Sequence, residues 1–225
     1  MRDLMSAAFW GQMAFAVWET FYITIMATAF ALVIGIPLGV LLVAGEKDGV
    51  LPLPAWLMHA LNVVINLLRS IPFLILMIMV FPLSRLILGT TVGTNATIVP
   101  LVVAAFPFIA RLVETCLREV DPGVIEAAQS MGATPFQIIW KVMLPESLPG
   151  LISNITTALT TILGYSAMSG AIGGGGLGQV AISYGYYRYN TPVMLVAVVL
   201  LILLVQGFQS IGTRLATRSD KRLRQ

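Results

Sequence analysis

The residue types that most often carry catalysis or bind metal ions are nearly absent from this sequence. His59 is the only histidine and Cys116 is the only cysteine among its 225 residues. A serine-type triad would have to use His59, and a metal cluster or an internal disulfide needs more histidines or cysteines than the chain has. We therefore predict no catalytic residues, no metal site and no cofactor, and we interpret Cys116 as a small packing residue near a helix end.

A glycine-rich run offers the other pattern with known chemistry. Gly173, Gly175 and Gly178 match the spacing G-x-G-x-x-G that binds dinucleotides when it follows a strand and opens a helix. Here the run follows an apolar stretch of about 20 residues, with no alternation of strand and helix, and it holds no lysine of the P-loop type. We expect a turn or a close helix approach instead.

The composition belongs to a membrane protein rather than to a soluble domain. The chain is 58% hydrophobic and 10% charged, and its mean hydropathy is +0.91. Membrane-spanning helices need about 20 mostly apolar residues. Five stretches meet this condition, at about 20–44, 57–83, 96–112, 148–168 and 192–211. We predict one all-helical membrane domain over 18–213, between a leader segment 1–17 and a basic tail 214–225.

The leader weakly imitates a signal peptide, with Arg2 followed by an apolar run. We favour a retained leader, because Asp3 offsets Arg2 and because Gly11 and Gln12 break the apolar run before it continues into a full-length span.

Lysines and arginines are unevenly divided between the two sides that five spans define. One side carries the nine residues Lys47, Arg111, Arg118, Lys141, Arg214, Arg218, Lys221, Arg222 and Arg224; the other carries the three residues Arg2, Arg85 and Arg188, and Arg69 is left out because it falls inside the second span. Cations gather on the cytoplasmic side, so we expect the N-terminus outside and the C-terminus in the cytoplasm. No nucleic-acid recognition motif accompanies the basic tail, which argues against nucleic acid as a partner.

The second span is interrupted near its middle by Arg69-Ser-Ile-Pro72. A proline bends or breaks a helix, and an ionisable residue inside a membrane is a functional candidate. Arg69 either faces a transport path or lies at the cytoplasmic interface with its aliphatic stem in the membrane. The sequence leaves both alternatives open.

The long hydrophilic stretch 121–145 predicts two short helices. Asp121-Pro122 starts the first and Gly132 ends it; Thr134-Pro135-Phe136-Gln137 starts the second with a capping box, and Leu144-Pro145 ends it. Each helix has an apolar side at helical spacing, made by Val124, Ile125, Ala128 and Met131 in the first and by Phe136, Ile139, Trp140 and Met143 in the second. These sides either dock on a cytoplasmic partner or cap the protein's own helix bundle.

The same stretch carries a family signature. Glu126-Ala127-Ala128, Gly132, Val142 and Leu144-Pro145 match the pattern E-A-A-x3-G-x9-I-x-L-P, with valine in place of isoleucine. With this pattern the chain resembles the permease subunits of ABC importers. The resemblance implies a type I importer permease fold in which 121–145 is the coupling segment between the third and fourth spans, and in which Glu126, Ala127, Ala128, Gly132, Leu144 and Pro145 contact the ATPase.

Further segments resemble the methionine importer permeases of this family. These segments are Val17-Trp-Glu-Thr20, Arg69-Ser-Ile-Pro-Phe73, Pro107-Phe-Ile-Ala-Arg111, Met131-Gly-Ala-Thr-Pro135 and Gly164-Tyr-Ser-Ala-Met168. The resemblance runs from Trp18 to about Thr213. It implies methionine import by a homodimer with two copies of a cytoplasmic ATPase and a periplasmic or lipid-anchored substrate-binding protein, in a bacterial inner membrane.

Two alternatives share the composition of this chain. The first is the same permease role for another amino acid. The second is an ion-coupled secondary transporter. Such a transporter needs carboxylates inside the membrane to couple ions, and spans one, three, four and five as drawn hold no acidic residue.

The end of the fourth span is a candidate gate. Tyr165, Ser166 and Met168 precede the glycine run, and a flexible thioether can seal a passage or line a route for an apolar side chain. Packing is the alternative role for Met168. We expect these residues and Arg69 to be the candidates for the translocation path.

Overall fold

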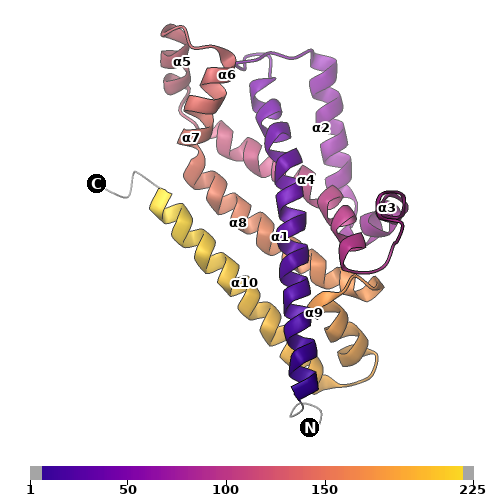
Figure 1. Cartoon of the computed structure of the whole chain (residues 1–225). Helices are drawn as coiled ribbons and strands as arrows, with labels where there is room; N and C mark the ends of the chain where they lie inside the picture. Colours follow the sequence, from indigo (N-terminus) through magenta and orange to yellow (C-terminus); the bar gives the residue numbers. More distant parts are fainter. Residues whose placement is uncertain (1–6, 220–225) are drawn as a thin grey trace. The chain divides into compact units, whose positions relative to one another are not determined.

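The computed structural model describes residues 7–219, and that part of the chain is helical with no β-strand (Figure 1). In chain order its helices are α1 Ala7–Ala44, α2 Ala55–Ser70, α3 Phe73–Leu88, α4 Thr94–Arg118, α5 Pro122–Ser130, α6 Pro135–Ile138, the π-helix η2 Ile139–Met143, α7 Leu144–Glu146, α8 Leu148–Ser169, the 3-10 helix η3 Gly170–Ile172, α9 Gly176–Gln179, the π-helix η4 Val180–Tyr186 and α10 Thr191–Ser219.

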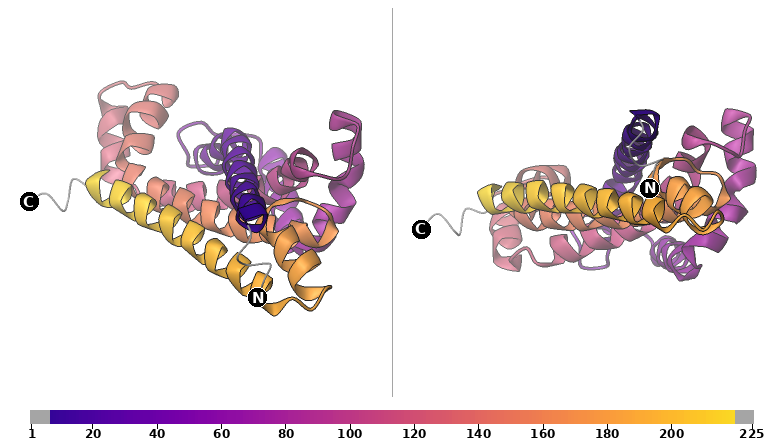
Figure 2. Two further views of the ribbon diagram at one scale, coloured as in Figure 1. Left: turned by 60° about the horizontal axis from the view of Figure 1, so that its bottom comes forward. Right: turned by 90° about the horizontal axis from the view of Figure 1, so that it is seen from below.

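Within residues 7–219, four helices are long and apolar enough to cross a membrane: α1, α4, α8 with its 3-10 extension, and α10. The broken pair α2 and α3 supplies a fifth span if it is counted as one. Figure 2 shows α10, in yellow, as a long continuous helix in two further views. The predicted all-helical fold is confirmed, with four spans, or five if the pair α2 and α3, bent by 112°, is one span. The predicted interruption of the second span is confirmed at Ile71-Pro72.

The first helix differs from its predicted span, because it begins at Ala7 rather than near Thr20 and is 38 residues long. Residues 7–17, expected as a leader, are the first turns of this helix. Phe9, Met13 and Ala16 recur at helical spacing and are buried, which stabilises these turns. Gly11 lies inside this helix and does not interrupt it. Arg2 and Asp3 lie outside the described residues.

The basic tail also begins as helix. Arg214 and Arg218 belong to the last turns of α10, whereas Lys221, Arg222 and Arg224 lie outside the described residues.

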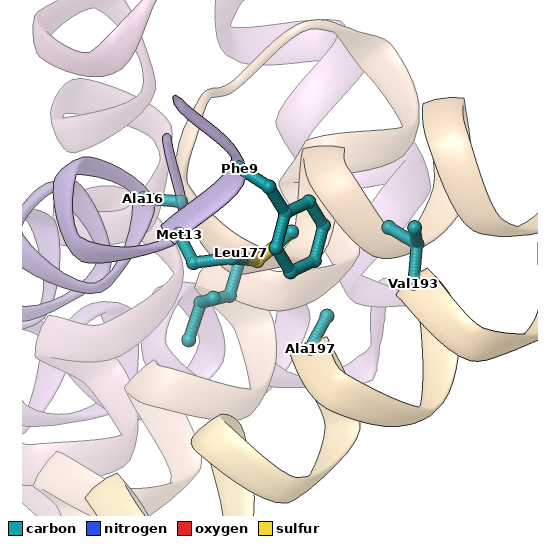
Figure 3. Packing of buried hydrophobic residues seen from close by; sticks show 6 residues of the cluster. All are labelled: Phe9, Met13, Ala16, Leu177, Val193 and Ala197. Carbon is teal, nitrogen blue, oxygen red and sulfur yellow. The ribbon is translucent and has the colours of Figure 1, made fainter. Parts of the chain in front are cut away.

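Contacts divide the chain into two compact units, which we describe separately. The first unit comprises residues up to 30, 71–105 and 159–209. Its core packs the start of α1 on α9 and α10 through Phe9, Met13, Ala16, Leu177, Val193 and Ala197 (Figure 3). The glycine run packs tightly here: a Cβ on Gly178 would lie 2.1 Å from the Ala167 carbonyl oxygen, and one on Gly170 would lie 2.2 Å from the Gln179 nitrogen. Of the two predicted alternatives, the close helix approach is confirmed at Gly178.

Among the described residues, the second unit comprises 31–70, 106–158 and 210–219. Leu42, Ile65 and Ala110 form a buried cluster that joins α1, α2 and α4. α1 and α4 approach each other closely, because a Cβ on Gly39 would lie 2.6 Å from the Ala110 carbonyl oxygen. This unit carries α5, α6, η2 and α7, and therefore the whole of the predicted coupling segment.

Candidate functional site

The first short helix of the coupling segment has the boundaries that its sequence predicts. The Asp121 side chain accepts a hydrogen bond of 2.8 Å from the Gly123 N–H, and Pro122 occupies the first turn, where its missing N–H costs nothing. At the other end, the Ala133 N–H donates to the Ala128 carbonyl and the Gly132 N–H donates to the Gln129 carbonyl. This is a Schellman motif, which requires the left-handed φ of +79° at Gly132.

The second short helix begins with the predicted capping box. The Gln137 N–H donates to the Thr134 hydroxyl, and the Thr134 N–H donates to the Gln137 side-chain oxygen at 2.9 Å. Two backbone donors of the first turn are thereby satisfied by side chains. The capping fixes where α6 starts.

The predicted end of this second helix at Leu144-Pro145 is wrong. The helical path continues through the π-helix η2 and α7 to Glu146. In η2 the Leu144 N–H donates to the carbonyl of Ile139, five residues back, and this wider turn puts Pro145 in the first turn of α7, where proline is tolerated. The turn closes at Ser147, whose hydroxyl donates to the Met143 carbonyl at 2.8 Å.

The apolar residues of the two short helices divide between a buried and an exposed set. Ala128, Ile138, Ile139 and Met143 are buried, whereas Val124, Met131, Phe136 and Trp140 are exposed. The exposed Phe136 and Trp140 rings touch at a centroid distance of 6.0 Å. The buried set packs the segment on its own unit, which is the second of the two alternatives from the sequence. The exposed set leaves aromatic and aliphatic side chains uncovered. We call Val124, Glu126, Met131, Phe136 and Trp140 the exposed loop set.

Of the residues singled out by the signature, Glu126, Ala127, Gly132 and Pro145 are exposed and Leu144 is half-buried. Ala128 is buried, with 5% of its surface exposed. Its side chain packs inside the protein and its carbonyl accepts the capping bond, so its expected contact with a partner is not available in this structure. A small residue at this position lets α5 pack against η2.

The base of the coupling segment is held by charged side chains that the sequence analysis did not combine. Arg118, in the last turn of α4, donates to Glu114 at 2.9 Å and to Glu46, in the turn after α1, at 2.6 Å. Arg111 pairs with Glu114 at 2.6 Å and donates to the Asn62 side chain at 2.7 Å. The spacing of 111, 114 and 118 on one helix predicts the contacts within α4, whereas the bridge to Glu46 is tertiary and has no local signal.

The gate candidates occupy the end of α8 in different ways. The Tyr165 ring stacks on Phe73 of α3, with centroids 4.2 Å apart and planes at 6°. Ser166 is buried and donates to the Leu163 carbonyl at 2.8 Å, so its hydroxyl serves its own helix. The Met168 side chain is 45% exposed. The structure thus brings Tyr165 to Phe73 and leaves Met168 accessible.

Arg69 is exposed in the last turn of α2 and forms no ion pair with residues 7–219. Both sequence alternatives for Arg69 remain compatible with this position.

A polar contact between α1 and α9 was missed by the sequence analysis. The Glu19 carboxylate accepts from the Gly176 N–H at 3.0 Å and from the Thr94 hydroxyl, while the Thr20 hydroxyl accepts from the Leu177 N–H at 2.8 Å. These side chains satisfy the first amides of α9. Glu19 and Gly176 are 157 residues apart in sequence, and no local pattern links them.

Known proteins resemble this chain over most of its length. The family model described as binding-protein-dependent transport system inner membrane component matches residues 35–225. The chain is 53% identical to the probable D-methionine transport system permease protein MetI of Vibrio cholerae, with 92% of each chain covered. It is 47% identical to the corresponding protein of Pasteurella multocida, with 97% of this chain and 100% of that one covered.

A solved structure of the MetNI methionine ABC transporter in inward-facing conformations has the same fold. It matches with a TM-score of 0.93 at 46% identity, and the match covers 96% of this chain and 100% of that one. The chain therefore belongs to the family of binding-protein-dependent transport system inner membrane components, the multi-pass membrane permeases of ABC importers.

Proposed function

We propose that the chain is the permease subunit of an ATP-driven importer of methionine that accepts the L form and the D form. The observation that carries this proposal is the match to the methionine transporter structure at 46% identity over nearly the whole chain. Relatives named for D-methionine transport support it.

A substrate test separates this proposal from the same role for another amino acid. We expect unlabelled L-methionine to abolish uptake of labelled methionine by the reconstituted importer, and D-methionine to compete as well. Histidine and leucine at the same concentration should compete little. Equal competition by one of these would assign a different or a broader substrate.

The importer works as a homodimer with two ATPase copies and a separate substrate-binding protein. A methionine zwitterion crosses hydrocarbon only where its charges stay solvated, since burying an unpaired ion costs several kcal/mol or more. One chain with five spans is too thin to enclose such a path, and two copies about a two-fold axis provide one. The MetNI relative, described as an ABC transporter, supports the ATPase partner.

The exposed loop set is the ATPase contact in this proposal. Phe136 and Trp140 supply large exposed rings next to each other, and aromatic anchors carry much of the energy of protein interfaces. Glu126, Ala127 and Pro145 are exposed on the same segment, and Gly132 sets its turn. Ala128 and Leu144 act indirectly by packing the segment on its unit.

The sides of the membrane on which the two termini lie follow from the cytoplasmic position of the ATPase. A coupling segment that meets the ATPase must be cytoplasmic, and two spans, α8 and α10, separate it from the C-terminus, which is then cytoplasmic too. Three spans precede the segment, if the broken pair counts as one, so the N-terminus is outside. The nine-to-three distribution of lysine and arginine supports the same orientation.

Met168 is the proposed gate residue, with Tyr165 positioning it. Met168 is accessible at the end of α8, and its flexible thioether can close against the second copy of the chain and then withdraw. Ser166 stabilises the end of this helix. Arg69, an exposed cation in the last turn of α2 just before the break, is the charged residue that we propose for the path.

A further inference from the structure

The first unit contains a cavity that the transport mechanism above does not use. The cavity has a volume of about 810 Å³ and lies between the first turns of α1 and the segment from α9 to the start of α10. Sites for small ligands are typically clefts of about 300–1,000 Å³. The volume is therefore sufficient for an amino acid or for the headgroup of a phospholipid.

The apolar side of this cavity is already packed. Phe9, Met13 and Val193 line it and belong to the buried cluster in Figure 3. Phe15 also lines it but is 62% exposed. An apolar portion of a ligand would have preformed contacts here, so little ordering free energy would be lost on binding.

The cavity is also lined by one acid and one base that do not pair with each other. Glu19 is held in place by the Gly176 N–H and the Thr94 hydroxyl. A carboxylate has about four acceptor positions, so about two remain for a ligand. Arg188 is exposed, its guanidinium lies 4.5 Å from the centre of the Tyr184 ring, and it forms no ion pair with residues 7–219. The ring contact restricts the guanidinium while its N–H donors stay free.

The charges determine what kind of ligand fits. A purely anionic ligand would be attracted by Arg188 and repelled by Glu19, and a purely cationic ligand would meet the reverse. A ligand with both charges satisfies both, and the amides of Gln12, Gln179 and Asn190 in the lining add further hydrogen-bonding groups. Electrostatic complementarity of this kind selects the ligand as well as attracting it.

We infer that this cavity binds a zwitterion, whose primary ammonium meets Glu19, whose carboxylate or phosphate meets Arg188, and whose apolar part contacts Phe9 and Met13. Two sources share this chemistry: a free amino acid and the headgroup of phosphatidylethanolamine. The inference rests on the cavity and goes beyond the proposed transport role, since the cavity residues are neither the gate nor the coupling segment.

The test measures binding to the whole permease–ATPase complex in nanodiscs, without binding protein and without nucleotide. L-methionine binding is measured by calorimetry in nanodiscs of phosphatidylcholine and phosphatidylglycerol. Retention of phosphatidylethanolamine against phosphatidylglycerol is measured by native mass spectrometry. Arg188→Gln, a change at an exposed side chain, should weaken binding of the true ligand about tenfold, the loss typical of a hydrogen bond to a charged group.

Arg85→Gln is the matched control, because Arg85 is an exposed arginine of the same unit that does not line the cavity. Methionine binding that depends on Arg188 but not on Arg85 identifies a free amino acid as the ligand of the cavity. Retention of phosphatidylethanolamine with the same dependence assigns the lipid. The inference is overturned if Arg188→Gln weakens neither methionine binding nor the preference for phosphatidylethanolamine over phosphatidylglycerol, which has no ammonium. Glu19→Gln provides a second variant and should weaken the same probe.

Discussion

Phe73 and Tyr165 stack face to face, with ring centroids 4.2 Å apart and planes inclined by only 6°. Phe73 is the first residue of α3, directly after the break at Ile71-Pro72, and Tyr165 lies in the last turn of α8. Met168 follows Tyr165 by three residues and so lies on the adjacent part of the same helix. The stack therefore links the interruption of the second span to the candidate gate.

Removing the stack should release the end of α8. Aromatic pairs contribute about 0.5–1.5 kcal/mol beyond their buried area, so Phe73→Ala should raise substrate leak and basal ATPase activity while the complex still assembles. Tyr165→Phe is the control, since it keeps the ring and removes only the hydroxyl. The measurements are methionine efflux from loaded vesicles and ATP hydrolysis without binding protein. Unchanged leak in Phe73→Ala would make the stack a packing contact only.

Met168→Ala should affect leak more than assembly. The side chain is accessible in this structure, so shortening it removes a seal without leaving a buried cavity. We expect faster ATP-independent methionine efflux with normal ATPase co-purification. Met194→Ala, at a comparably exposed methionine of α10, should behave as wild type. Equal efflux from the two variants would assign Met168 to packing.

The coupling segment should tolerate little change at Gly132. Its φ of +79° costs a non-glycine residue about 1–2 kcal/mol, and a new side chain there would point into open space. Gly132→Trp should abolish association with the ATPase while membrane insertion is retained, and Glu126→Arg should do the same by reversing an exposed charge. Both are measured by co-purification of the ATPase.

Gly89→Trp is the matched control for Gly132→Trp. Gly89 has nearly the same φ, +77°, with open space around it, but it follows α3 rather than the coupling segment. It should keep the ATPase bound. Normal co-purification with both Gly132→Trp and Glu126→Arg would remove the coupling assignment from this segment.

The ion pair between Arg118 and Glu46 should matter for coupling rather than for stability. Its side chains are 47% and 45% exposed, and exposed pairs contribute only about 0–1 kcal/mol. It nevertheless joins the turn after α1 to the base of the coupling segment. Glu46→Gln should raise the ATP hydrolysed per methionine transported, with little change in melting temperature. Lys47→Gln is the neighbouring control, and an unchanged ratio in Glu46→Gln would leave the pair without a role in transport.

Local signals were reliable where the chain itself provides the hydrogen bonds. Asp121, Gly132 and the Thr134 capping box set helix ends through contacts within five residues, and all three were predicted from sequence. The apolar spans were predictable for a similar reason, since bilayer thickness fixes their length.

Tertiary packing decided the features that the sequence analysis missed. Phe9 and Met13 recur at helical spacing, but their burial against α9 and α10, which stabilises the helix over Ala7 to Val17, is a tertiary contact. Pro145 fails to end its helix because the π-turn before it changes the hydrogen-bond register. Glu19 holds the amide of Gly176 across 157 residues, and only the fold brings them together.

The central claim is tested most directly by uptake of labelled methionine into proteoliposomes that contain this chain, its ATPase and its binding protein. The account predicts accumulation only when ATP is available to the ATPase, with no effect of collapsing proton and sodium gradients. ATP-dependent accumulation of a different amino acid would keep the permease assignment and discard methionine. Accumulation driven by an ion gradient without ATP would contradict the account.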